Sequence, residues 1–129
     1  MSGLEWIVEA FGCDAGALVN QERLEELFRL IVEELDLHPL GKTAWHEFPN
    51  TGGVTGVCLL RESHITVHTF PEYESLCLNV FCCRPRRATD FEALLKIGFH
   101  PVRVHVREVE RPYQQRVDPG HEQPSGELS

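Results

Sequence analysis

Residues 54–82 read VTGVCLLRESHITVHTFPEYESLCLNVFC, three short apolar runs joined by two short polar segments. The runs Val54 to Leu60, Ile65 to Phe70 and Leu76 to Cys82 are rich in β-branched and aromatic residues, which is typical of strands. The links between them are too short to contain a helix. This part of the chain therefore predicts successive antiparallel strands.

The rest of the chain adds three strand-like runs and two helices. Residues 3–11, 42–48 and 101–109 are the strands, and in the last of them valines alternate with basic residues, as in a half-buried strand. Asn20 is a plausible cap for an amphipathic helix over 21–35, whose apolar residues recur at spacings of three and four. A second helix covers 90–97, with Thr89 or Asp90 as its cap.

These elements predict an α+β fold, a two-layer α/β sandwich whose antiparallel sheet carries two helices on one face. The other face of such a sheet needs a partner, and a second copy of the chain is the simplest one. Residues 1–111 form the expected domain. Residues 112–129 are polar, with little to bury, and predict a flexible tail.

Composition narrows the class of protein. The 129 residues suit one domain, and 20 acidic against 12 basic residues give a net charge of −8, which argues against a nucleic-acid partner. No apolar run reaches the ~18 residues needed to cross a bilayer, and no secretion signal opens the chain. Five cysteines without regular spacing favour a reducing, cytoplasmic location over a disulfide framework.

Residues 62–72, ESHITVHTFPE, form the densest polar cluster in an apolar setting. Strand parity places His64, Thr66 and His68 on one face and Ser63 on the other, unless the chain bends. From physical chemistry alone, a strand with hydrogen-bonded histidines followed by a proline turn accounts for the segment.

The same segment resembles a motif of the prokaryotic S-adenosylmethionine decarboxylase proenzymes, Glu-Ser-His-(Leu/Ile)-(Ser/Thr)-(Ile/Val)-His-Thr-Trp-Pro-Glu, with Phe70 in place of the Trp. Residues 53–57 (GVTGV) resemble the family's Gly-Val-Ser-Gly-Val, and residues 79–84 (NVFCCR) its Asp-x-(Phe/Tyr)-Thr-Cys-Gly. Residues 3–14 and 103–106 resemble its opening segment and last strand. The similarity spans about residues 3–111, and a long motif with correctly spaced flanks is a specific signal.

The resemblance implies a self-processing, pyruvoyl-dependent enzyme of polyamine synthesis. The Ser63 hydroxyl attacks the Glu62 carbonyl, and the resulting ester is eliminated to leave a pyruvoyl group at position 63, the cofactor that forms a Schiff base with a small amino-acid-type substrate. His68 is the implied base, and Thr55 replaces a serine that assists processing. Cys83, rather than Cys82, is the implied proton donor. The family also implies a homodimer with active sites at or near its interface.

Several departures from the motif bear on the substrate. Glu5 stands where the family has His, Asn79 replaces Asp, and Arg84 replaces a Gly. Drift at tolerant positions is one explanation. The other is a changed pocket for ornithine or arginine, in which Glu5 pairs with a distal cation and Arg84 with an α-carboxylate. Phe48 is still available to stack on adenine, so S-adenosylmethionine is the first expectation.

Two hypotheses of another class stand beside the enzyme. His64 and His68, with Cys82 and Cys83, could bind zinc, although adjacent cysteines lack the usual spacing of zinc sites and this hypothesis leaves Glu62 and Ser63 unexplained. The chain could also be an inactive binding subunit, against which the retained Ser63, His68 and Cys83 argue. We therefore expect no metal at the catalytic site.

Overall fold

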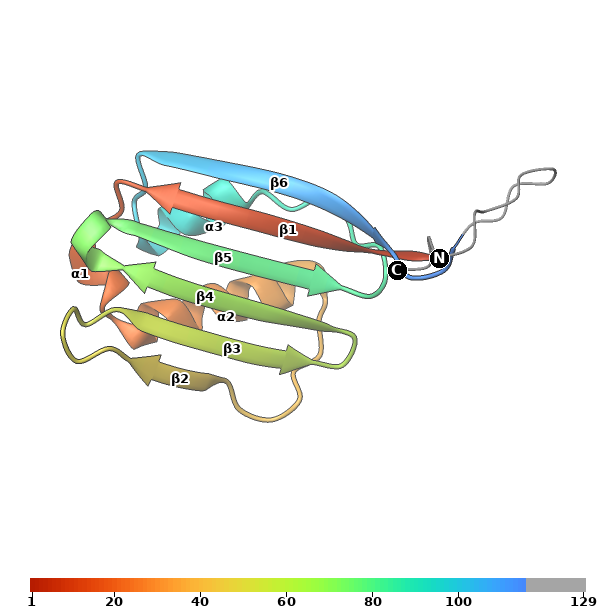
Figure 1. Ribbon diagram of the computed structural model, residues 1–129, viewed down its shortest axis with the longest axis horizontal. Coiled ribbons are helices and arrows are strands. Elements are labelled where there is room, and N and C mark those ends of the chain that lie inside the picture. The colour runs from red at the N-terminus through yellow and green to blue at the C-terminus, as the bar shows by residue number, and fades with distance from the viewer. Residues whose placement is uncertain (116–129) are drawn as a thin grey trace, which may run out of the picture.

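A computed structural model describes residues 1–115 of the chain, which form a single sheet with helices on one side (Figure 1). The sheet has six strands in the order β2-β3-β4-β5-β1-β6, and all neighbouring strands are antiparallel. The strands are β1 (Ser2–Phe11), β2 (Ala44–Glu47), β3 (Val54–Leu60), β4 (Ser63–Phe70), β5 (Ser75–Cys82) and β6 (Arg103–Pro112). The helices are α1 (Ala15–Leu18), α2 (Gln21–Leu35) and α3 (Phe91–Gly98), with a 3₁₀ turn η1 (Pro71–Tyr73).

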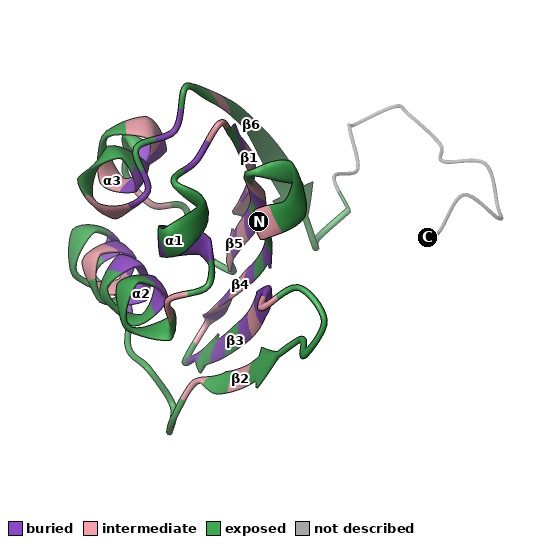
Figure 2. Cartoon of the chain, turned by 90° about the vertical axis from the view of Figure 1, so that its left-hand side faces the viewer, coloured by how far each residue is buried: buried purple, intermediate pink, exposed green. Residues whose placement is uncertain are grey.

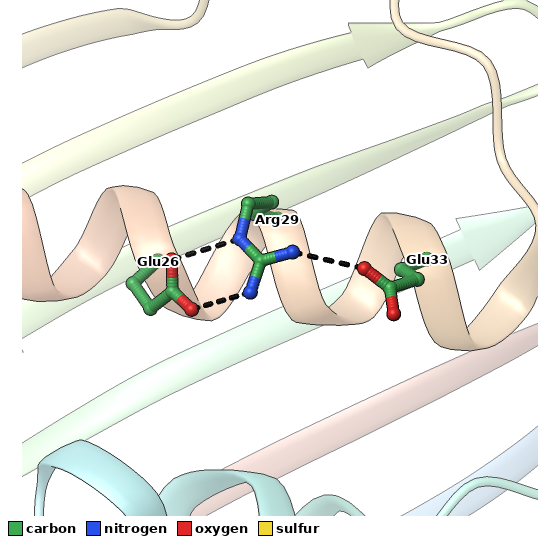
Figure 3. A network of polar contacts seen from close by, with 3 residues as sticks. All are labelled: Glu26, Arg29 and Glu33. Carbon is green, nitrogen blue, oxygen red and sulfur yellow. Dashed lines mark hydrogen bonds and ion pairs between the residues drawn. The ribbon is translucent and has the colours of Figure 1, made fainter.

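Helix α2 illustrates how the covered face is built. Asn20 caps it, because its side-chain oxygen accepts hydrogen bonds from the backbone N–H groups of Glu22 (3.0 Å) and Arg23 (3.4 Å). Its apolar residues face the sheet and are buried in the core, as Figure 2 shows for this layer. Its outer face is polar, and there Arg29 bridges Glu26 and Glu33, each about one turn away from it (Figure 3). The apolar face of the helix is thus buried against the sheet, and its polar face is exposed to solvent.

The predicted fold class is confirmed, with three corrections to the elements. A third helix, α1, has only four residues, too few for a recognisable period, and begins where Asp14 accepts a hydrogen bond from the Gly16 N–H (3.1 Å). Strand β4 begins at Ser63 rather than Ile65, because residues 60 and 63 already pair across the turn. Pro112, predicted as the start of the tail, is the last residue of β6. Residues 116–129 of the predicted tail lie outside the described part of the chain.

The second face of the sheet is open. It carries polar and charged side chains together with apolar ones that are more than a third exposed: Phe11, Val57, Leu59, Phe70 and Val109. Within residues 1–115, no helix is long and apolar enough to cross a membrane. The open face therefore leaves several large apolar side chains exposed to solvent.

Candidate active site

Glu62 and Ser63 lie at the turn between β3 and β4, and the backbone on both sides of their peptide bond is held in place. The Cys83 N–H donates a 2.7 Å hydrogen bond to the Glu62 carbonyl oxygen, and the Arg61 N–H donates one of 2.9 Å to His38. A donor on a carbonyl oxygen stabilises the negative charge that develops when a nucleophile adds to the carbon. The Glu62 carbonyl is thus polarised by a main-chain donor.

Gly3 makes this arrangement sterically feasible. A Cβ atom at Gly3 would lie 2.3 Å from the Cys82 carbonyl oxygen and 3.2 Å from the Cys83 Cα. Strand β1 can therefore approach the Cys82–Cys83 backbone this closely only without a side chain at position 3. This glycine opens the segment that resembles the family's first motif, but its contact could be seen only in the folded chain.

Ser63 faces the helices and is only 7% exposed. It lines a cavity of about 340 Å³ on the covered side of the sheet, together with Glu62 and three arginines. Within it, the Arg84 Nε lies 2.9 Å from a Glu62 carboxylate oxygen. Nothing in the sequence pattern pointed to two of these arginines, Arg61 and Arg86, because only the fold brings residues 35–38, 61–63 and 84–86 together.

The two adjacent cysteines have different environments. Cys82 is fully buried directly opposite Ser63 in the register of β4 and β5, and burial raises the pKa of its thiol, although the charge of Arg86 acts in the opposite direction. Cys83 is exposed. Of the two thiols, only that of Cys83 is therefore accessible to a small molecule.

Thr55 and His68 lie together at the other end of the same hairpin. The Thr55 Oγ1 is 3.0 Å from the His68 Nδ1, so these two predicted processing residues form one unit. Phe48 is 46% exposed and lines a second cavity, of about 290 Å³, with this pair. Its exposed ring remains available for stacking.

The fold separates this pair from Ser63. Strand parity is confirmed, since Ser63 is buried on the covered side while His64, Thr66 and His68 lie on the open side. Ser63 and His68 are five positions apart along strand β4, which corresponds to roughly 16 Å. Ser63 and His68 are therefore not brought together within one chain.

A polar network on the open face surrounds Glu5. Its carboxylate accepts a 2.7 Å hydrogen bond from the Asn79 amide and pairs with Arg111, and the Asn79 oxygen lies 3.3 Å from the His64 Nε2. Burial raises the pKa of Glu5, but the hydrogen bonds from Asn79 and Arg111 and the positive charge of Arg111 outweigh it, so the pKa lies below its usual value. Phe81 stacks on His64, with ring centroids 5.6 Å apart.

The zinc hypothesis finds no geometric support in the described chain. Cys82 is buried on the covered side of the sheet, whereas His64 and His68 lie on the open side. Across residues 1–115, no three His, Cys, Asp or Glu side chains are grouped as metal ligands. All five cysteines are free thiols.

Comparisons with known proteins agree with the motif. The family model described as S-adenosylmethionine decarboxylase matches residues 4–112. An S-adenosylmethionine decarboxylase proenzyme of Thermococcus gammatolerans is 33% identical over 120 residues, covering 90% of this chain and 80% of the relative. One of Clostridium botulinum (strain Hall) is 32% identical over 114 residues, covering 85% and 94%. The crystal structure of the adenosylmethionine decarboxylase from Aquifex aeolicus VF5 has the same fold, with a TM-score of 0.72 at 24% identity over 91% of this chain and 96% of that one.

Proposed function

Because the chain belongs to the S-adenosylmethionine decarboxylase family, we propose that it cleaves itself between Glu62 and Ser63 and decarboxylates S-adenosylmethionine with the pyruvoyl group so formed. The observation that carries the proposal is the 2.7 Å hydrogen bond from the Cys83 N–H to the Glu62 carbonyl. It places an oxyanion donor on the one carbonyl that the adjacent Ser63 hydroxyl must attack. The five free thiols suit a reducing, cytoplasmic location for this reaction.

The cleavage can be written entirely with groups of the chain and one water. The Ser63 Oγ adds to the Glu62 carbonyl carbon, and the C–N bond breaks as an ester forms. Loss of the Ser63 α-proton then breaks the Cβ–Oγ bond and expels the Glu62 carboxylate. The dehydroalanine left at position 63 gains a proton on its β-carbon and becomes an imine, which water hydrolyses to ammonia and the pyruvoyl group.

Decarboxylation would use residues on the open side of the same end. The pyruvoyl group supplies an electrophilic carbonyl that withdraws electrons from the substrate. Exposed Cys83 would donate a proton to the substrate carbon. The site fits a pyruvoyl group because its precursor, Ser63, begins strand β4, and the Cys83 N–H holds the carbonyl of the preceding residue, Glu62.

The separation of Ser63 from His68 supports a homodimer. A second copy packed across the open face about a two-fold axis would bring the Thr55–His68 end of each copy to the Ser63 end of the other, twice. His68 of the second copy would approach residue 63 from the open side, leaving the covered side to the hydroxyl. The exposed apolar residues of that face would be buried in the same contact.

S-adenosylmethionine is favoured over ornithine and arginine because the two residues predicted to bind those substrates, Glu5 and Arg84, already contact other side chains of the chain. Glu5, expected to hold a distal cation, is occupied by Arg111 and Asn79. Arg84, expected to hold the α-carboxylate of the substrate, instead lines the cavity behind the Glu62–Ser63 bond and contacts the Glu62 side chain there through its Nε. Phe48, predicted to stack on adenine, keeps an exposed ring.

The test is the intact mass of the purified, denatured protein, followed by release of labelled CO₂ from each of the three substrates. The wild-type chain is expected to give residues 1–62 and a second chain lighter by one ammonia than residues 63–129. Ser63→Ala should stay uncut, whereas the matched variant Ser75→Ala should be cut like the wild type. An uncut wild-type chain would overturn the proposal, and turnover of ornithine or arginine alone would overturn the choice of substrate.

A further inference from the structure

The cavity behind the Glu62–Ser63 bond is basic in an otherwise acidic protein. Arg61, Arg84 and Arg86 line it, and the carboxylates that line it are Asp36 and Glu62. The cavity therefore has an excess of one positive charge, while the whole chain has a net charge of −8. Such a local reversal of charge indicates a site for an anion.

Within residues 1–115, part of the donor capacity of Arg84 and Arg86 is unused. Arg84 uses its Nε for the Glu62 side chain. The Arg86 Nε is buried and, within residues 1–115, has no hydrogen-bond partner, which is costly for a polar atom removed from water. Arg87, next in the sequence, differs, because it pairs with Glu34 on α2 and does not line the cavity.

Self-cleavage creates an anion at this place. Ordinary hydrolysis of a peptide bond gives a carboxylate and an ammonium group together. Formation of a pyruvoyl group instead releases the nitrogen as ammonia, so the new α-carboxylate of Glu62 has no cationic counterpart. That carboxylate would neutralise the excess charge of the cavity.

We propose that Arg61, Arg84 and Arg86 form a binding site for the α-carboxylate that cleavage creates at Glu62, and that Arg84 stabilises this carboxylate as it leaves. The inference rests on the proposed function, since it requires the cleavage. In the elimination step the Ser63 Cα–H and Cβ–Oγ bonds break, a Cα–Cβ double bond forms, and both electrons of the Cβ–Oγ bond remain on the Glu62 carboxylate. A guanidinium beside that group lowers the energy of the developing charge.

The position of Arg84 in the chain supports this role. Arg84 directly follows Cys83, whose N–H holds the Glu62 carbonyl oxygen at 2.7 Å. Because its Nε already contacts the Glu62 side chain, the two Nη groups remain for the α-carboxylate of the same residue. The positive charge of Arg86 also reaches Cys82, which lies beside Ser63 in the sheet. The family motif has glycine at position 84, so this device belongs to this chain rather than to the motif.

The experiment follows cleavage of the full-length chain over time by intact mass, with and without hydroxylamine, which cleaves esters. Arg84→Ala is expected to slow formation of the pyruvoyl chain about tenfold and to accumulate an ester, which hydroxylamine converts into residues 1–62 ending in a hydroxamate and a chain that still begins with serine. The effect should fall short of the ~10²-fold loss typical of a buried oxyanion donor, because the Arg84 side chain is 66% exposed. Arg84→Lys should restore most of the rate, and Arg87→Ala should cleave like the wild type.

A second readout separates a carboxylate site from a general effect on folding. In cleaved protein labelled with ¹³C at the glutamate carboxyl carbons, the new α-carboxyl of Glu62 should titrate below the usual ~3.3–3.7, and closer to that range in Arg84→Ala and Arg86→Ala. Wild-type rates in Arg84→Ala, with no trapped ester and an unchanged titration, would overturn the carboxylate site while leaving the proposed function intact. A wild-type chain that never cleaves would overturn both.

Discussion

The two ends of the β3–β4 hairpin contain different kinds of chemistry. At the Ser63 end, main-chain groups do the positioning: the Cys83 N–H holds the Glu62 carbonyl, and Gly3 admits the backbone that carries it. At the other end, two side chains, Thr55 and His68, contact each other at 3.0 Å. The difference agrees with the proposal that one end prepares the bond to be broken, that the other offers a proton acceptor, and that the two ends meet between two copies.

The largest expected effect tests whether the two ends serve each other between chains. His68→Ala alone should cleave at least ~10²-fold more slowly, because general base catalysis contributes about that much. Ser63→Ala alone should not cleave. When the two variants are expressed together, the His68→Ala chain should be cut, since the Ser63→Ala chain supplies an intact His68. Intact mass distinguishes the chains.

The matched control replaces the helper chain by the double variant Ser63→Ala, His68→Ala, which has no base to offer. His68→Ala chains should then stay uncut, although the same dimers can form. Equal cleavage with both helper chains, or no cleavage with either, would show that His68 of a second copy does not serve Ser63. The two ends of the hairpin would then not act together between two copies.

The sequence predicted which residues lie at the two ends of the hairpin better than it predicted how those residues are arranged in space. Strand parity along residues 63–70 was enough to place Ser63 and His68 on opposite faces of the sheet, and the structure confirms it. The motif, however, associates both residues with one reaction without saying whether they belong to one chain or two. A motif records spacing along the chain, whereas the separation of the two residues depends on the strand that joins them.

Other features depend on contacts that no local pattern encodes. Arg111 meets Glu5 because β6 pairs with β1 in a register that places residue 111 opposite Gly3. The arginine cavity combines three segments that are far apart in the sequence. Helix α1 was missed because four residues are too few to show a period.

A smaller effect is expected from Gly3→Ala, which disturbs only the Ser63 end. Its new Cβ, 2.3 Å from the Cys82 carbonyl oxygen, must displace the backbone that carries the Cys83 N–H. We expect the free energy of unfolding to fall by about 1–3 kcal/mol, as for other overpacked positions, and cleavage to slow. Urea denaturation in an uncleavable Ser63→Ala background measures the first, and intact mass of the cleavable chain the second.

Gly98→Ala is the matched control, because a Cβ at this helical glycine meets nothing within 4 Å. It should leave cleavage unchanged and leave stability equal or raised by up to about 1 kcal/mol. If Gly3→Ala behaved like Gly98→Ala, the close approach of β1 would not organise the Ser63 end. Main-chain packing against Gly3 would then not be what positions the Glu62 carbonyl.

The smallest effect concerns the Glu5 network on the open face of the Ser63 end. The Glu5 side chain is only 15% exposed and its folded-state pKa lies below the usual 4.5, so its ionised form stabilises the fold. This contribution is fully present above the unfolded-state pKa and is lost as the pH falls through the lower, folded-state pKa. In the Ser63→Ala background, Glu5→Gln should therefore lower the free energy of unfolding by about 1 kcal/mol at pH 7, and the difference from the parent should shrink below about pH 4.5.

Glu26→Gln, which removes a half-exposed partner of Arg29 on α2, should lower the free energy of unfolding by less, because solvent screens that pair. Equal losses for the two variants in urea titrations across this pH range would mean that the Glu5 network is no more than a surface ion pair, and that the Ser63 end is organised by its main chain alone.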